Sequence, residues 1–168
     1  MKNPKEKGND HERKVAKLLS DWSGQKFMRT PMSGAIHNFK DKRVVSDIVA
    51  PLSLGNWPFS IECKKVENSW EFSSFIDGTS MTLKDHWKQC CDDAEREDMV
   101  PMLVFTKNYR DIFIMITKDT FYQLEIEPES YINLVHKEQD LVIMKFSDLL
   151  SSISVEELLS KNLLGAKL

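Results

Sequence analysis

The chain has 168 residues, 41% of them hydrophobic, and this length and composition allow one sizeable buried core. No run of about 18 apolar residues is present to span a bilayer, and the polar residues 1–10 lack the apolar core of a signal peptide, so we expect no membrane partner and a cytoplasmic protein. The net charge of −3 conceals an asymmetry, because residues 1–65 hold 13 Lys and Arg against 7 Asp and Glu, whereas residues 66–168 hold 10 against 19. The basic part is either a face that binds a polyanion or ordinary solvated charge, and the count does not separate the two.

Hydrophobic spacing predicts the first element. Apolar residues at i, i+3, i+4 and i+7 indicate an amphipathic helix over residues 9–22, capped by Asn9 or Asp10 and ended by Gly24. The further elements expected from apolar runs and turn residues are strands over 26–29, 44–50 and 59–65, a helix over 84–97, strands over 102–106, 112–117, 132–135 and 141–146, and a helix over 155–164. This order indicates a mixed α/β fold, a central sheet flanked by helices. The strands over 44–50 and 59–65 are expected to be neighbours, because only a turn-like segment separates them.

A charged face is expected on the strand over residues 59–65. Alternation along a strand sends Glu62 and Lys64 to the same face. Asp47 is a second unusual charge, because it lies within an apolar run. Two carboxylates on neighbouring strands repel each other, and a divalent ion that prefers oxygen ligands, such as Mg²⁺, would remove the repulsion, leaving Lys64 to orient or deprotonate a water. The alternative is a solvated ion pair on an edge strand, and the residues by themselves leave both readings open.

The same residues form a known pattern. Residues 46–50, Ser-Asp-Ile-Val-Ala, followed by residues 61–64, Ile-Glu-Cys-Lys, resemble the split PD...(D/E)XK signature of a large nuclease superfamily. The resemblance implies a restriction-endonuclease-like α/β fold, hydrolysis of DNA phosphodiesters, and Mg²⁺ as the cofactor, with Mn²⁺ as a substitute. The catalytic and metal-binding groups that it implies are Asp47, Glu62, Lys64 and the backbone carbonyl of Cys63.

Two further features resemble archaeal-type Holliday junction resolvases, including phage-borne relatives. Glu12 falls on the buried stripe of the first helix, where these enzymes carry an additional glutamate, which implies a catalytic role and a contact to the metal, directly or through water. Residues 29–34, Arg-Thr-Pro-Met-Ser-Gly, resemble the Arg...Ser-Gly segment that precedes the catalytic aspartate, which implies that Arg29 and Ser33 contact DNA phosphates. A phage-borne enzyme would act in the host cytoplasm.

The resemblance extends over residues 8–106, and residues 107–168 carry no part of it. We therefore expect one nuclease domain over residues 1–168 that resolves four-way DNA junctions in recombination and repair. We also expect it to form a homodimer, because a two-fold dimer presents one active site to each of the two symmetric cleavage points of such a junction. The alternatives are another PD-(D/E)XK nuclease, such as a restriction-type endonuclease or a recombination exonuclease, and a DNA-binding domain without catalysis. The aromatic residues Trp70, Phe72 and Phe75 either stack on exposed bases or anchor a loop.

Overall fold

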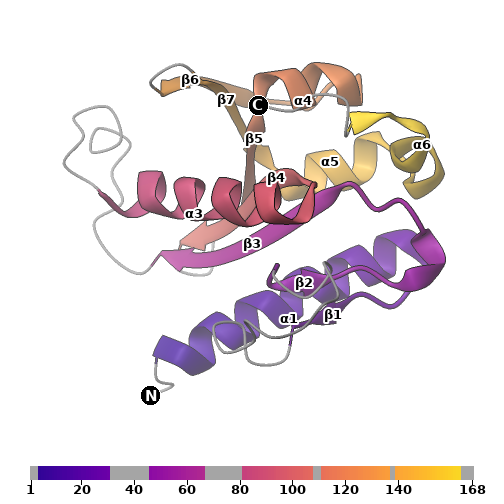
Figure 1. Ribbon diagram of the computed structural model, residues 1–168, viewed down its shortest axis with the longest axis horizontal. Helices are drawn as coiled ribbons and strands as arrows, with labels where there is room; N and C mark the ends of the chain where they lie inside the picture. The colour runs from indigo at the N-terminus through magenta and orange to yellow at the C-terminus, as the bar shows by residue number, and fades with distance from the viewer. Residues whose placement is uncertain (1–3, 31–45, 67–80, 108–110, 137–138, 164–168) are drawn as a thin grey trace.

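A computed structural model describes residues 4–30, 46–66, 81–107, 111–136 and 139–163, and it places the described helices around a five-stranded sheet (Figure 1). In chain order the elements are α1 (Pro4–Ser23), β1 (Met28–Arg29), β2 (Ile48–Val49), the 3₁₀ turn η2 (Leu52–Leu54), β3 (Phe59–Val66), α3 (Met81–Glu97), β4 (Val100–Lys107), β5 (Ile112–Thr117), α4 (Lys118–Leu124), β6 (Tyr131–His136), β7 (Gln139–Lys145), α5 (Phe146–Ser152) and α6 (Val155–Ser160).

The strands of the main sheet lie in the order β3-β4-β5-β7-β6. β3 and β4 run parallel, a pairing that needs a long crossover connection, and α3 lies within that connection. The other three pairs are antiparallel. β1 and β2 form a separate two-stranded antiparallel sheet, in which Arg29 lies opposite Ile48. Among the described strands, β3 and β6 are therefore the two edges of the main sheet.

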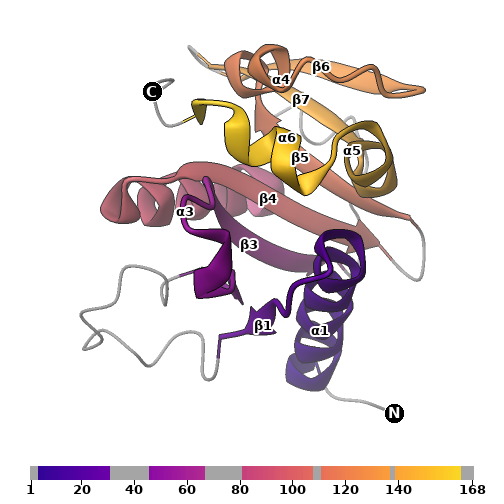
Figure 2. The same ribbon diagram turned by 90° about the vertical axis from the view of Figure 1, so that its right-hand side faces the viewer.

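Helices cover both faces of the main sheet, as the alternation of side chains along β4 shows. Met102 and Val104 belong to one apolar cluster, which also contains buried residues of α1, α4, α5 and α6. Leu103 and Phe105 belong to a second cluster, which contains buried residues of α3. The mixed α/β architecture expected from the sequence is confirmed. In both Figure 1 and Figure 2, α1 lies at the end of the molecule opposite β6 and α4.

Several boundaries differ from those that the sequence predicts. The first helix begins at Pro4, so Asn9 and Asp10 lie inside it and the predicted cap is wrong; the run of polar residues before Asn9 carries no apolar periodicity that would reveal the extra turns. Gly24 has a φ of +66°, and the helix ends before it as predicted.

The later part of the chain also differs in detail. The strand Ile112–Thr117 is confirmed at the predicted bounds. The predicted strand over 141–146 ends one residue early, because Phe146 begins α5, and the last helix ends at Ser160 instead of residue 164. The helices α4 and α5 were not predicted, because each has only seven residues, too few to show a helical period.

The prediction that the segments over 44–50 and 59–65 are neighbours is confirmed, because the amide of Asp47 donates to the carbonyl oxygen of Ile61, although the two segments form no strand ladder with each other. β2 pairs with β1, and only residues 48 and 49 of the predicted strand are extended, while residues 44 and 45 lie outside the described residues. Ser33 and the aromatic residues Trp70, Phe72 and Phe75 also lie outside them. Within the described residues, no helix is both long and apolar enough to span a membrane.

Candidate active site

β3 carries the Glu62 and Lys64 side chains on the face of the sheet that α3 covers. Glu62 lies beside Leu103 in the parallel register, and Leu103 belongs to the apolar cluster of α3. The neighbours Ile61 and Cys63 point to the opposite cluster, so the predicted alternation is confirmed. Glu62 is buried, and its Oε1 lies 2.5 Å from the Nζ of the half-buried Lys64.

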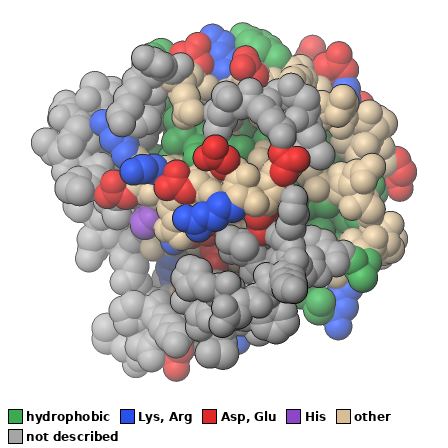
Figure 3. All heavy atoms as spheres, viewed as in Figure 1, with side chains coloured by type: hydrophobic (Ala, Val, Ile, Leu, Met, Phe, Trp, Pro, Cys, Tyr) green, Lys and Arg blue, Asp and Glu red, His purple; other side chains and the backbone are tan. Residues whose placement is uncertain are grey.

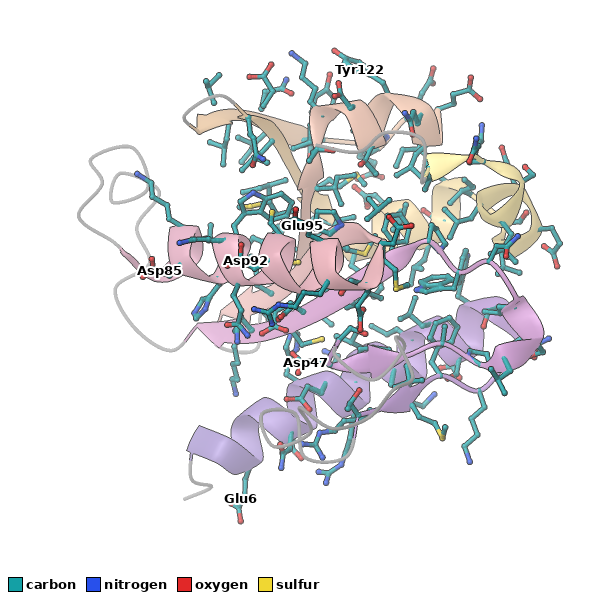
Figure 4. All side chains as sticks on the ribbon, viewed as in Figure 1. Glu6, Asp47, Asp85, Asp92, Glu95 and Tyr122 are labelled. Atoms are coloured by element: carbon teal, nitrogen blue, oxygen red, sulfur yellow. The ribbon has the colours of Figure 1, made fainter. Side chains whose placement is uncertain are left out.

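Asp47 is held at the outer edge of β3 by both its backbone and its carboxylate. Its amide donates to the carbonyl oxygen of Ile61 at 2.9 Å, and its Oδ2 accepts from the amide of Cys63 at 2.8 Å. A side chain thus occupies the place that a neighbouring strand would take. Figure 4 shows Asp47 between α1 and β3. The two segments predicted to be adjacent therefore do meet, through Asp47 and not through a ladder of strand pairs.

The segment around Asp47 is fixed from its other side by Thr30. The amide of Thr30 donates to the carbonyl oxygen of Asp47 at 2.9 Å, and its hydroxyl donates to the carbonyl oxygen of Ser46 at 2.5 Å. Thr30, Ser46 and Asp47 are all buried. Because backbone and side-chain hydrogen bonds converge on these three residues, the carboxylate position is set by the fold and not by a free loop.

The electrostatics of Asp47 indicate a site with excess negative charge. The pKa of the Asp47 carboxyl is raised to about 7, first by burial and then by the nearby charge of Glu62, while the hydrogen bond from Cys63 opposes the rise by a smaller amount. The pKa of the buried Cys63 thiol is also raised, first by burial and then by Asp47, Glu62 and Glu12. Three carboxylates therefore act on one position of β3, and a cation there would relieve their mutual repulsion.

Lys64 remains a cation in this environment. Burial lowers its pKa, but the charge of Glu62 and the hydrogen bond to it raise the pKa by more, so that the net change is upward. A lysine whose pKa is raised holds its proton at neutral pH. In this arrangement Lys64 is suited to orient a water or to neutralise negative charge, and it is not suited to remove a proton.

Glu12 reaches the site from α1 and is held there by Arg29. The Glu12 side chain is buried, and its Oε2 forms an ion pair with the Nε of Arg29. The Nη2 of Arg29 donates to the Oδ1 of Asn9 at 2.8 Å. The predicted contact of Arg29 with DNA stays a prediction, because the structure shows its guanidinium engaged by α1.

Sequence reasoning missed the support that Asn9 gives to this pair. The sequence predicts Asn9 as a possible helix cap, but Asn9 lies three residues before Glu12 on α1, a spacing that places both side chains on one helix face. That spacing was the available signal. His11 of α1 is also buried, its Nε2 lies 3.4 Å from the carbonyl oxygen of Val104, and burial lowers its pKa to about 4.

The fit of the site to a metal ion depends on its oxygen donors. Within the described ranges, no group of three or more His, Cys, Asp or Glu residues is arranged to hold a metal. Asp47 and Glu62 nevertheless offer two buried carboxylates. The amide of Cys63 points to the outer edge of β3, and the carbonyl of a strand residue points to the same side as its amide, so this carbonyl faces the same edge. Carboxylate and carbonyl oxygens with room for waters suit Mg²⁺.

Among the described side chains, Figure 3 shows no separate gathering of Lys and Arg on the face that it draws. Acidic and basic side chains lie close together across the middle of that face, over α3. The labelled residues Asp85, Asp92 and Glu95 lie along this helix in Figure 4. The basic residues at 40, 42 and 43 lie outside the described residues. A polyanion-binding face therefore stays a prediction for the N-terminal part.

Comparison with known proteins gives a family match over most of the chain. A family model described as "Phage putative PDDEXK endonuclease" matches residues 3–160. The chain belongs to this family of phage nucleases of the PD-(D/E)XK type. It is similar to Protein D14 of Escherichia phage T5, with 27% identity over 161 residues that cover 92% of this chain and 96% of that protein. No solved structure matches the chain.

Proposed function

We propose that the chain is a Mg²⁺-dependent endonuclease that cuts branched DNA, with four-way junctions as its preferred substrate and a homodimer as its active form. The observation that carries the nuclease chemistry is the placement of the Asp47 carboxylate at the edge of β3, next to the pair of the buried Glu62 and the half-buried Lys64. The family supports a nuclease. The preference for junctions is supported by the order of Glu12, Arg29, Asp47, Glu62 and Lys64 along the chain, which resembles that of resolvases.

In this proposal, Asp47, Glu62 and the backbone carbonyl of Cys63 hold the metal, and Mn²⁺ can replace Mg²⁺. The bound ion would supply a Lewis acid for the scissile phosphate and a more acidic water. A cation held there would favour the ionised form of Asp47, whose pKa is raised first by burial and then by the charge of Glu62. Glu62 keeps Lys64 protonated and in place, so that the ammonium orients the attacking water or neutralises charge on the phosphate.

Glu12 and Arg29 complete the site on the side of α1. The ion pair with Arg29 holds Glu12 toward the other carboxylates, where it could contact a bound metal through water. Arg29 is the more exposed member of the pair, and its guanidinium can also donate to a phosphate oxygen. Arg29 and Ser33 are proposed as DNA-contacting residues on the strength of the resemblance.

The test is a cleavage assay of the purified chain with Mg²⁺ on labelled linear, nicked, flapped and four-way DNA of shared sequence. We expect paired nicks in opposite strands of the four-way DNA, and competition by unlabelled junction but not by linear duplex. Glu62→Gln should abolish cleavage and keep DNA binding, whereas the matched control Glu95→Gln, on the exposed face of α3, should behave as the unmodified chain.

Two results would contradict the proposal at different levels. Sequence-fixed double-strand cuts or progressive loss of ends, with linear duplex competing as well as the junction, would exclude a resolvase and leave another nuclease of the family. No cleavage of any DNA, or undiminished cleavage by Glu62→Gln, would refute the active site itself.

A further inference from the structure

β6 is an edge strand whose outer side has no partner among the described strands. The opposite edge of the sheet is different, because the backbone and carboxylate of Asp47 bond to the outer side of β3. An unpaired edge offers a row of amide and carbonyl groups to any extended segment that approaches it. Natural proteins protect such edges with charged side chains, with proline or with bulges.

None of these protections is present in β6. Its sequence is Tyr-Ile-Asn-Leu-Val-His, without Asp, Glu, Lys, Arg or Pro, in a chain of which 29% of the residues are charged. Three of its apolar side chains are exposed, with exposed fractions of 47% for Tyr131, 44% for Ile132 and 77% for Val135. An uncharged apolar edge strand of this kind is suited to pairing with another strand.

We propose that a second copy of this chain pairs with β6 through its own β6, in antiparallel orientation, so that two five-stranded sheets form one continuous sheet. The inference names the surface of the homodimer proposed above and rests on that part of the proposal. A two-fold axis makes such a contact self-complementary, since each residue meets its counterpart in exchanged roles. The lack of charge on β6 means that no like charges meet at the axis.

The faces of β6 select the register. Leu134 packs in the cluster of α3, and Ile132 shares its face because it lies two residues away. The ring of Tyr131 lies 4.9 Å from that of Phe121 on α4, so Tyr131, Asn133 and Val135 belong to the other face. Residues directly opposite in an antiparallel pair point to the same face. One residue of β6 must therefore lie opposite its own copy, with the two-fold axis between the two copies; we call this an axis through that residue.

An axis through Asn133 gives apolar contacts on both faces. It places the aromatic Tyr131 opposite the β-branched Val135 of the partner subunit, and the aliphatic Ile132 opposite the aliphatic Leu134 of the partner subunit, both of which are favourable cross-strand pairs. An axis through Leu134 would instead place Asn133 opposite the partner's Val135, an amide against an apolar side chain. We therefore assign the axis to Asn133.

α4 extends the contact surface beyond the strand. Tyr122 has an exposed fraction of 62%, and its ring lies 5.9 Å from Phe121, the ring that also contacts Tyr131. Figure 4 shows Tyr122 at the outer side of the molecule, on the same end as β6 in Figure 1. A stable interface covers more area than one six-residue strand pair provides, and Tyr122 supplies apolar area next to it.

The first test compares the mass of the chain in solution with that of two lysine variants. Val135→Lys places two charges in the proposed interface at a position so exposed that the fold of the single chain is unaffected. Leu52→Lys, on η2, is the matched control, because Leu52 is similarly exposed, with a fraction of 72%. We expect a dimer for the unmodified chain and for Leu52→Lys, and at least a tenfold rise in the dimer dissociation constant for Val135→Lys. A monomeric unmodified chain, or a Val135→Lys variant that dimerises normally, would overturn the proposal.

A second test addresses the register. Asn133→Lys and Asn133→Asp should each weaken the dimer, because the residue at the axis faces its own copy. Mixing the two variants should restore dimers that contain one copy of each. Failure of the mixture to pair, while both single variants are folded by circular dichroism, would overturn the assignment of the axis to Asn133.

These results are separate from those for catalysis. Solution mass reports the interface whether or not DNA is cut, and Val135 lies on the edge opposite the candidate active site. If the nuclease proposal fails and the mass results hold, the interface stands. If single nicks persist in Val135→Lys while paired nicks are lost, both proposals are supported together.

Discussion

Asp47→Asn should stabilise the metal-free protein at alkaline pH while it abolishes cleavage. The reason lies in the pKa of Asp47, which is 3.8 for an ordinary aspartate and about 7 in the folded chain, where burial and Glu62 oppose ionisation. A carboxyl whose pKa is raised by folding contributes its full stability below its unfolded pKa and loses that stability as the pH rises through the folded value. The penalty therefore grows between about pH 4 and pH 7 and is constant above that.

The magnitude follows from the two pKa values. One pKa unit corresponds to about 1.4 kcal/mol, so ionisation of Asp47 costs the folded state on the order of 4 kcal/mol at pH 8. The amide oxygen of asparagine can still accept from Cys63, but its nitrogen replaces a carboxylate oxygen and needs a new partner. We therefore expect about half of the full gain, or about 2 kcal/mol, which corresponds to a rise in Tm of roughly 4–8 °C.

The assay is thermal and urea unfolding in EDTA at pH 4, 6 and 8, repeated at pH 8 with excess Mg²⁺. We expect the advantage of Asp47→Asn to be absent at pH 4 and full at pH 8. With Mg²⁺ at about a hundred times its dissociation constant, the unmodified chain should gain about 2.7 kcal/mol and the variant should gain much less. A variant that is less stable than the unmodified chain at pH 8 in EDTA, or an advantage independent of pH, would refute the reasoning.

Three further predictions concern the metal, α1 and the buried histidine. Replacing Mg²⁺ with Ca²⁺ should preserve DNA binding and stop cleavage, because the longer and looser coordination of Ca²⁺ positions a water poorly; turnover at the Mg²⁺ rate in a nicking assay would contradict it. Arg29→Ala should lower the free energy of unfolding by about 2–3 kcal/mol, because it leaves the buried Glu12 without its partner. The double variant with Glu12→Gln should lose less stability than the sum of the two single changes. Strict additivity in urea unfolding would show that the pair is not coupled. If Arg29 also contacts a phosphate, its removal should reduce the slope of log K against log salt for DNA binding by about 0.9, and an unchanged slope would limit Arg29 to holding Glu12. Burial lowers the pKa of His11 to about 4, so its contribution to stability is complete above its unfolded pKa near 6.5 and is lost as the pH falls through 4. Between these pH values the unmodified chain should lose about 3 kcal/mol more stability than His11→Gln. Parallel curves of unfolding free energy against pH for the two proteins would exclude a contribution from His11 titration.

The elements of the fold that could be predicted from the sequence are those with a clear local pattern of apolar residues. Ile112–Thr117 is a continuous apolar run and was found at its bounds, whereas the helices Lys118–Leu124 and Phe146–Ser152 are too short to show a period. The pairing of Ile48–Val49 with Met28–Arg29 depends on contacts between distant segments, so no local pattern could show it.

The candidate site divides in the same way. The shared face of Glu62 and Lys64 follows from strand alternation alone. The ion pair of Glu12 with Arg29 joins residues 17 positions apart, and the bond of Asp47 to Cys63 joins residues 16 positions apart, so neither could be derived from spacing. The motif resemblance assigned these residues to one site, but only the structure shows their hydrogen-bond partners Asn9 and Thr30.

The strand order fixes a distance as well as a topology. The candidate active site lies on β3 and the proposed two-fold axis on β6, at opposite edges of the sheet. Neighbouring strands are spaced by about 4.8 Å, so in a continuous sheet of two copies the β3 strands are about 43 Å apart before twist is considered. Each candidate active site would then be about 20 Å from the axis, the length of about six stacked base pairs at 3.4 Å each. The dimer would act as a ruler, and mapping of the nicks should place them several nucleotides from the crossover, symmetrically on both strands.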